Sequence, residues 1–261
     1  MQMSHRSSVP VNTLKGSVLL IAFTLGSASL ASSPETPCAI SSETKLPFFG
    51  DLHIHTRYSF DSYLSNQKND PDGAYEYAKG RVITLPNAYG EQTVSAQIDR
   101  PIDFAAVTDH GQFLGEVALC DSDWSQAAWW APVCLMSRAQ NLWIQLYAAS
   151  LWTVSGGMEG KAPERGMVCA LGDCETSALS VWGDIQAAAE RHYDRSEDCS
   201  FTTFVGYEYT QGQEMANLHR NVIFRNEAVT ARPISVFETE SSVPELWRQL
   251  RTQCLDADGQ C

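Results

Sequence analysis

The chain contains the segment FFGDLHIHT at residues 48–56, in which two histidines lie two positions apart after a mostly apolar run. The apolar residues predict a buried strand that is entered from a loop. Because side chains alternate between faces along a strand, His53 and His55 would share one face and Ile54 would lie on the other. Two imidazoles on one face can bind a metal ion together. The pair fits two packed, hydrogen-bonded histidines equally well, so the choice depends on whether the chain supplies other ligands.

Further residues of metal-ligating types follow at or near the ends of later predicted strands. Residues 101–111 form the second strand, and its near-continuous apolar run indicates burial on both faces, as in a parallel sheet. The third strand spans 201–210 and the fourth spans 218–224. The residues concerned are Asp109, His110, Glu208 and His219. In α/β barrels the C-terminal ends of the strands form one face, so we expect these side chains to lie near His53 and His55.

The segments that flank these strands are predicted to be helical or irregular. Residues 70–80 form a short helix, with proline near its first position and glycine at its end. Residues 81–100 are polar and irregular, and residues 212–217 form a loop. A final helix runs to residue 250 and is capped by Ser242.

Residues 120–200 form an insertion that contains helical periodicity over 137–152 and 177–193. His192 lies in the second of these helices among charged residues and is predicted to be an ordinary surface residue. Six tryptophans in this region could line a substrate cleft, but core packing is the better expectation for such large side chains. They are Trp124, Trp129, Trp130, Trp143, Trp152 and Trp182.

Residues 1–31 have the pattern of a secretory signal peptide. A positively charged start precedes an apolar run at residues 18–25, and small residues lead to a predicted cleavage site after Ala31. The apolar run is too short to span a bilayer comfortably, so we expect no stable membrane insertion after cleavage. Residues 32–45 form a linker, and 46–261 form the domain of a periplasmic or secreted protein.

All eight cysteines lie beyond the predicted cleavage site, which fits export to an oxidising compartment. The even number permits complete pairing, and the absence of any CxxC argues against cysteine-based zinc sites. Sequence separation favours the pairs Cys120–Cys134, Cys169–Cys174 and Cys254–Cys261, which leaves Cys38 for Cys199.

The formal net charge of −13 argues against nucleic acid and anionic membranes as main partners, because both favour basic surfaces. It does not argue against an anionic small-molecule ester as substrate. Bound divalent metal ions can make the local potential of a site positive in an otherwise acidic protein.

Four blocks of the sequence resemble known families. GDLHIHT at 50–56 and AVTDHG at 106–111 resemble the opening motifs of the PHP (polymerase and histidinol phosphatase) metallohydrolases. GYEYT at 206–210 and NLHRNVIFR at 217–225 are similar to a PHP-like family of exported proteins, domain of unknown function 3604 (DUF3604). The resemblance runs from about Phe48 to the C-terminus, and four blocks in order are far more specific than an HxH or TDH motif alone.

This resemblance implies an α/β fold, the distorted (β/α)7 barrel of the PHP proteins, holding two or three divalent ions, either zinc, manganese or iron. The metal ligands that it implies are His53, His55, Asp61, His110, Glu208 and His219. Glu208 matches the acid that bridges two metals, with a buried ion pair as its alternative. Asp61 matches a loop ligand less closely, with a solvated acid as its alternative.

The implied activity is that of a metal-dependent hydrolase, a phosphoesterase that uses metal-activated water. The chain has no GxSxG nucleophile motif, which favours water over a serine nucleophile. Arg220 could bind the substrate anion through its planar guanidinium or form an outward salt bridge, and Asp109 would act beside the ligands. Two alternatives remain: an exported metal-binding module without catalysis, and a metallohydrolase of sulfate ester or amide bonds.

The chain departs from the PHP pattern after its fourth strand. PHP barrels take further ligands from later strands, whereas His219 is the last histidine here. We therefore expect an incomplete barrel with a helical, disulfide-bearing insertion, the N-terminal part of a longer protein.

Overall fold

The computed structural model describes residues 44–86, 93–139, 141–156, 162–213, 216–256 and 261. The predicted signal peptide and most of the predicted linker lie outside these ranges. Within them, no helix is both long enough and apolar enough to cross a membrane.

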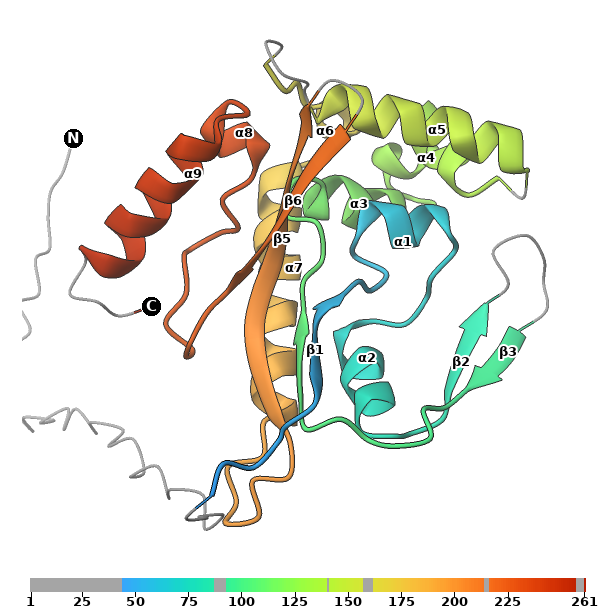
Figure 1. The fold of residues 1–261 in the computed structure, drawn as a ribbon. Coiled ribbons are helices and arrows are strands. Elements are labelled where there is room, and N and C mark those ends of the chain that lie inside the picture. Colours follow the sequence, from blue (N-terminus) through green and yellow to red (C-terminus); the bar gives the residue numbers. More distant parts are fainter. Residues whose placement is uncertain (1–43, 87–92, 140, 157–161, 214–215, 257–260) are drawn as a thin grey trace, which may run out of the picture. The chain divides into compact units, whose positions relative to one another are not determined.

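Four strands form a curled sheet, half of a barrel, in the order β1-β4-β5-β6 (Figure 1). They are β1 (Gly50–Ile54), β4 (Phe104–Val107), β5 (Thr202–Gln213) and β6 (Ala216–Ile223). β1 pairs in parallel with β4 and β4 with β5, whereas β6 is antiparallel to β5. Ala105, Ala106 and Val107 of β4 are fully buried, as its apolar run predicts. With the surrounding helices, this sheet makes the protein a mixed α/β fold.

The pairing of β5 with β6 extends further than the sequence predicts. Gly212 pairs with Asn217 and Gln213 pairs with Ala216, so the described ends of the predicted loop over 212–217 belong to strands. The loop prediction is therefore wrong there. The cause is the backbone ladder, which continues through glycine and polar residues without needing apolar alternation.

A second, two-stranded sheet lies within the segment that was predicted to be irregular. β2 (Ile83–Pro86) and β3 (Thr93–Ala96) pair in antiparallel register. Each strand has four residues and is partly or fully exposed. Such short, exposed strands give little hydrophobic periodicity, which explains why the prediction for 81–100 is wrong.

Two helices pack against the main sheet through the larger of the hydrophobic clusters. These are α2 (Pro71–Ala78) and α7 (Cys174–His192). The side chains of Asp70 and Asp173 cap the first turns of α2 and α7 respectively. Gly80 follows α2 with a φ of +81°, as expected for the glycine that ends a helix. Tyr75 of α2 and Trp182 of α7 are almost completely buried in the cluster that joins both helices to the strands.

A further set of helices builds a second hydrophobic cluster. They are α1 (Phe60–Leu64), α3 (Leu114–Cys120), η1 (Ala127–Trp130), α4 (Pro132–Ser137), α5 (Leu142–Ser155) and α6 (Met167–Leu171). A single helix over 137–152 is expected from the sequence, but α5 begins only after Asn141. The Asn141 side chain accepts hydrogen bonds from two backbone N–H groups of the first turn, and this cap fixes the start of α5.

The six tryptophans of this region differ in burial, and Trp129 is half-buried. Trp152 and Trp182 are buried, as expected for core residues. Trp124, Trp130 and Trp143 are more than half exposed, so core packing is wrong for these three.

The C-terminal part is helical. It contains α8 (Val236–Thr239), α9 (Val243–Leu250) and the π-helical turn η2 (Arg251–Leu255). Ser242 caps α9 by accepting a hydrogen bond from the backbone N–H of Glu245, as predicted.

Disulfides join Cys120 to Cys134, Cys169 to Cys174 and Cys254 to Cys261. These three predicted pairs are confirmed. Cys199 is also disulfide-bonded, and its predicted partner Cys38 lies outside the described residues.

Candidate metal centre

β1 carries both histidines of the HxH pair to the C-terminal end of the sheet. Gly50 allows β1 to lie close to β4, because a Cβ atom there would be 2.3 Å from the carbonyl oxygen of Phe104. Ile54 packs against the larger hydrophobic cluster. His53 and His55 therefore point away from that cluster, as the alternation of side chains along a strand predicts.

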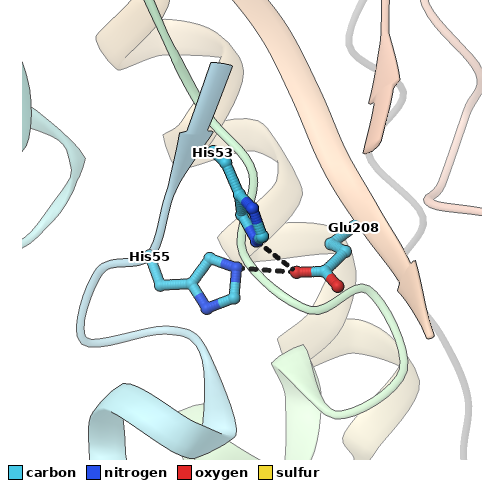
Figure 2. Close-up of side chains that lie close together, drawn as sticks. All are labelled: His53, His55 and Glu208. Carbon is cyan, nitrogen blue, oxygen red and sulfur yellow. Dashed lines mark hydrogen bonds and ion pairs between the residues drawn. The ribbon is translucent and has the colours of Figure 1, made fainter. Parts of the chain in front are cut away.

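Figure 2 shows that His53 and His55 converge on one carboxylate oxygen of Glu208. The Nε2 atoms of His53 and His55 lie 3.0 Å and 2.7 Å from Oε2 of Glu208. Glu208 is supplied by β5, and its side chain is completely buried. An isolated β-bridge between His110 and Glu208 continues the parallel pairing of β4 with β5, so the two residues lie opposite each other. The end of β1 and the middle of β5 thus place three potential ligands around one point.

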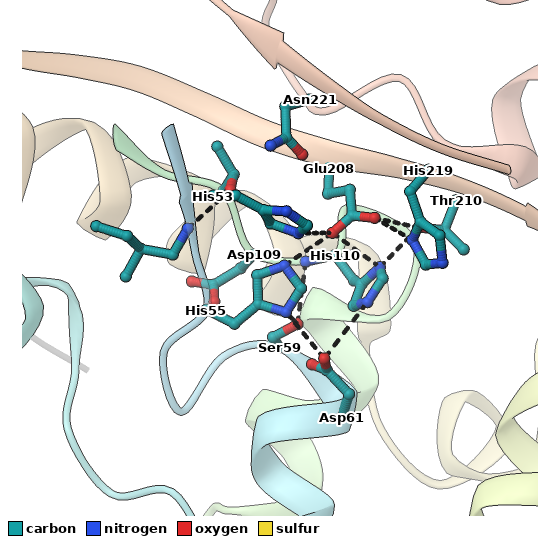
Figure 3. A network of polar contacts seen from close by, with 12 residues as sticks. His53, His55, Ser59, Asp61, Asp109, His110, Glu208, Thr210, His219 and Asn221 are labelled. Atoms are coloured by element: carbon teal, nitrogen blue, oxygen red, sulfur yellow. Dashed lines mark hydrogen bonds and ion pairs between the residues drawn. The ribbon is translucent and has the colours of Figure 1, made fainter. Parts of the chain in front are cut away.

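Asp61 enters the same site from the first turn of α1 (Figure 3). Its Oδ2 atom lies 2.9 Å from Nδ1 of His55 and 3.7 Å from Nε2 of His110. Ser59, which precedes α1, accepts a hydrogen bond from the backbone N–H of His110 at 3.2 Å. This bond anchors the start of α1 to the end of β4, so the loop after β1 brings its carboxylate back to the histidines.

His110 and His219 complete the group around Glu208, and Nδ1 of His110 lies 3.9 Å from Oε2 of its carboxylate. Nδ1 of His219 contacts Oε1 of Glu208. Thr210 lies between the two histidines, with its Oγ1 atom 2.8 Å from Nδ1 of His110 and 3.0 Å from Nδ1 of His219. Neither Thr210 nor Ser59 is predicted from the sequence to be a site residue. For Thr210 a signal existed, since a residue two positions after Glu208 on a strand shares its face.

The two predicted catalytic residues lie beside this group rather than within it. Asp109 is completely buried, and its carboxylate accepts hydrogen bonds from the backbone N–H and Oγ1 of Thr56. Burial raises the pKa of Asp109 to about 6, although the bonds from Thr56 oppose the shift. Arg220 is exposed and donates a hydrogen bond to the carbonyl oxygen of His219. Adjacent positions on β6 face opposite ways, so the Arg220 side chain starts on the face away from His219.

The imidazoles and carboxylates of the site shift each other's pKa values. Burial opposes ionisation of Glu208, but the neighbouring histidines outweigh it and lower the pKa of Glu208 to about 2. Burial would lower the pKa of His55, but hydrogen bonds to Asp61 and Glu208 raise it to about 10. Burial would raise the pKa of Asp61, but hydrogen bonds to His110 and His55 outweigh it and hold the pKa far below the ordinary value. The cluster is thus built to hold positive charge between two carboxylates, which a metal ion can supply in place of a proton.

The donor set fits divalent metal ions. Among the described residues, three groups of possible ligands meet in this site. In each group the ligand atoms all lie within 4.8 Å of one another, and every two groups share a member. They are His53–His55–Glu208, His55–Asp61–His110 and His110–Glu208–His219. These are the six residues that the sequence predicts as ligands. Imidazole nitrogen and carboxylate oxygen suit zinc, manganese and iron, and shared members are what adjacent ions require.

A further group, Glu116 with Cys169 and Cys174, also has metal-ligand spacing. Its two sulfur atoms form a disulfide with each other. A thiolate is the form of cysteine that binds metal, so this group is not a metal site in the oxidised protein.

Comparison with known proteins identifies a family. The family model described as "Protein of unknown function (DUF3604)" matches residues 42–261. No curated protein and no solved structure gives a significant match.

Proposed function

The chain belongs to the DUF3604 family, and we propose that it is a metal-dependent hydrolase of anionic esters, specifically a phosphoesterase. The observation that carries the proposal is the convergence of four histidines and two carboxylates from β1, α1, β4, β5 and β6 at one end of the sheet. Such a set is costly to assemble from five separate elements for structural reasons alone, because buried charged groups destabilise a fold unless they are paired.

The resemblance of residues 50–56 and 106–111 to the PHP metallohydrolases supports this proposal. The two parallel pairings of β1, β4 and β5, with His55 and His110 just beyond the C-terminal ends of β1 and β4, are compatible with part of a (β/α) barrel. We therefore extend the proposal to the fold, which would be of the distorted (β/α)7 barrel type.

The chemistry follows from the charge and exposure of the site. When bound, divalent ions supply a water molecule of lowered pKa and neutralise charge on phosphoryl oxygens. Glu208 directs one carboxylate oxygen to His53 and His55 and the other to His219. Two carboxylates contribute −2, less than the +4 of two divalent ions, so the occupied site would attract an anion.

One side of the site is buried and the other is exposed to solvent, as a hydrolase for a soluble substrate requires. The side chains of His110 and Glu208 are 4% and 0% exposed, whereas those of His53 and His219 are 55% and 43% exposed. A substrate can therefore approach from the side of His53 and His219. Water access to the buried side is restricted, which strengthens electrostatic interactions there.

A second candidate function is metal binding without catalysis. The observation that favours it is the position of Arg220, the cation predicted to bind the substrate anion, which is exposed and bonded to a backbone carbonyl. A hydrolase of sulfate ester or amide bonds would use the same ligands and is separated from a phosphoesterase only by its substrate.

We also propose that the protein works outside the cytoplasm, in the periplasm or as a secreted protein. The three described disulfides and the signal-like residues 1–31 support this location.

The test uses the full chain, freed of metal with a chelator and reloaded with zinc or manganese. Its hydrolysis of 4-nitrophenyl phosphate and bis(4-nitrophenyl) phosphate is compared with that of 4-nitrophenyl sulfate and a 4-nitroanilide. We expect cleavage of a phosphate ester that depends on added metal and falls at least about 100-fold in His55→Ala. The matched control is His192→Ala, which should retain full activity.

Any other outcome of this experiment would favour one of the alternative functions or contradict the metal site. Cleavage of the sulfate or the anilide alone would replace the phosphoesterase by another hydrolase. Stoichiometric metal binding without cleavage of any substrate would favour the non-catalytic binding module. Absence of metal binding would contradict both.

A further inference from the structure

The hydroxyl group of Thr210 lies at the centre of the candidate metal site, in contact with three of its six residues (Figure 3). Its Oγ1 atom is 2.8 Å from Nδ1 of His110, 3.0 Å from Nδ1 of His219 and 3.0 Å from Oε1 of Glu208. Thr210 is buried and follows Glu208 by two positions on β5, so both side chains project from the same face of the strand.

The hydrogen-bonding capacity of a hydroxyl decides the direction of these contacts. A hydroxyl group has one donor hydrogen and two acceptor lone pairs. The ionised carboxylate of Glu208 can only accept, so the Thr210 hydrogen is directed to Oε1. The two lone pairs then remain for the imidazoles, and both contacts are satisfied only if each Nδ1 carries a hydrogen.

We propose that Thr210 is a positioning residue that fixes His110 and His219 in the Nδ1–H tautomer, so that Nε2 of each ring is the metal-binding atom. This inference rests on the proposed metal site. A neutral imidazole has one protonated and one unprotonated nitrogen, and only the unprotonated one can bind a metal.

The surroundings of the two rings agree with this assignment. Nε2 of His110 faces Oδ2 of Asp61 at 3.7 Å, where a shared ion would lie between two ligands. Nδ1 of His219 also contacts Oε1 of Glu208, another group that can only accept a hydrogen bond when ionised. Metal-binding histidines generally donate their other N–H group to an acceptor that orients the ring. Thr210 would be this acceptor for both rings.

A threonine suits this role on a strand. Its β-branched side chain has restricted χ1 rotation, so the hydroxyl position is fixed by the backbone of β5. Valine has nearly the same shape without the hydroxyl, and serine keeps the hydroxyl without the methyl group. The pair of substitutions Thr210→Val and Thr210→Ser therefore separates the hydrogen bonds from the packing.

The experiment measures imidazole tautomers in the metal-free full chain by long-range ¹H–¹⁵N correlation at a pH where the rings are neutral. We expect the Nδ1–H form for His110 and His219 in the wild type and in Thr210→Ser. In Thr210→Val we expect His110 to lose that preference, whereas His219 keeps a second acceptor in Oε1 of Glu208. Zinc affinity, measured by competition with a chromophoric chelator, should fall about 10–100-fold in Thr210→Val and stay within about threefold in Thr210→Ser.

Thr203→Val is the matched control. Thr203 is another buried threonine of β5, and its Oγ1 donates to the carbonyl oxygen of Ala189 at 2.6 Å, away from the site. Its substitution should leave both tautomers and zinc affinity unchanged.

The tautomers separate this inference from the proposed function. An Nε2–H form of His110 in the wild type, or an unchanged tautomer of His110 in Thr210→Val, would overturn the role of Thr210 whether or not zinc binds. A wild-type protein with the expected tautomers but no zinc affinity would instead contradict the proposed metal centre. If Thr210→Val does not fold, the wild-type spectrum alone decides.

Discussion

The carboxylate of Asp109 accepts two hydrogen bonds from Thr56, one from the backbone N–H and one from Oγ1 at 2.7 Å. Thr56 follows His55 and Asp109 precedes His110, so this pair joins the ends of β1 and β4 directly behind the candidate metal site. Both residues are buried. Their bond therefore fixes the spacing between two histidines that arrive on different strands.

We expect Thr56→Val to lower the free energy of unfolding by about 1–3 kcal/mol, because it leaves a buried carboxylate oxygen without its partner. Urea denaturation of the metal-free protein measures this loss. Thr176→Val is the control, since Thr176 makes the same kind of bond to Asp173 at 2.8 Å but on the exposed surface. Its loss should be clearly smaller, and equal losses would show that the buried pair has no special role.

We expect His53→Ala and His55→Ala to lower the metal content of the purified protein, and His192→Ala to leave it unchanged. His53 and His55 face Glu208, whereas His192 bonds Asp72 at 3.0 Å and lies outside the three groups with metal-ligand spacing. Elemental analysis after dialysis gives the metal-to-protein ratio. The same ratio in all three variants would contradict the assignment of the HxH pair.

More of the candidate site than of the surrounding fold could be predicted from the sequence. The reason is that side chains alternate along a strand, so the spacing of two residues determines whether they share a face. His53 and His55 are an example, and their spacing alone indicates a common direction. Thr210 could not be singled out in the same way. Threonine is common in strands, and its role becomes visible only when His110 and His219 are brought beside it by other elements.

The fold shows the same division between local and long-range information. The caps of α2 and α9 follow from Asp70 and Ser242, which act on residues next to them in the chain. The antiparallel direction of β6 and the pairing of β2 with β3 depend on contacts between segments, and neither has a strong local pattern. The exposure of Trp143 likewise depends on which face of α5 meets its neighbours.

We expect the mature protein to contain no free thiol groups, since no free cysteine is found among the described residues. Intact mass after treatment with iodoacetamide, without reduction, should be unchanged. Replacement of both Cys120 and Cys134 by alanine should lower the free energy of unfolding by about 2–4 kcal/mol. The disulfide closes a loop between residues 14 positions apart, and without it the unfolded chain gains conformational entropy. Alkylation of several cysteines before reduction would contradict the predicted pairing.

The ion pair between α2 and α7 should make stability depend on pH. Oδ2 of Asp72 lies 2.6 Å from a guanidinium nitrogen of Arg191, and this bond lowers the pKa of Asp72 below its ordinary value. A carboxyl group with a lowered pKa stabilises the fold above its unfolded-state pKa, near 3.8, and loses that effect as the pH falls through the folded-state pKa.

We therefore expect Asp72→Asn to cost about 0.2–1 kcal/mol at pH 7, a small value because the pair is partly exposed. Urea denaturation at pH 7 and at progressively lower pH should show the difference from wild type shrinking once the pH falls below about 4. A difference that stays constant or grows at low pH would contradict the ion pair.

Ions are proposed to bind where β1 and β4 end, against Glu208 and His219 in the middle of β5 and β6. The most direct test is anomalous diffraction at the zinc edge from crystals of the full chain grown with zinc. We expect at least two anomalous peaks in the site, one of them about 2.0–2.2 Å from Nε2 of His53, Nε2 of His55 and Oε2 of Glu208. Zinc found only at other positions, with these three side chains still bonded directly to one another, would contradict it.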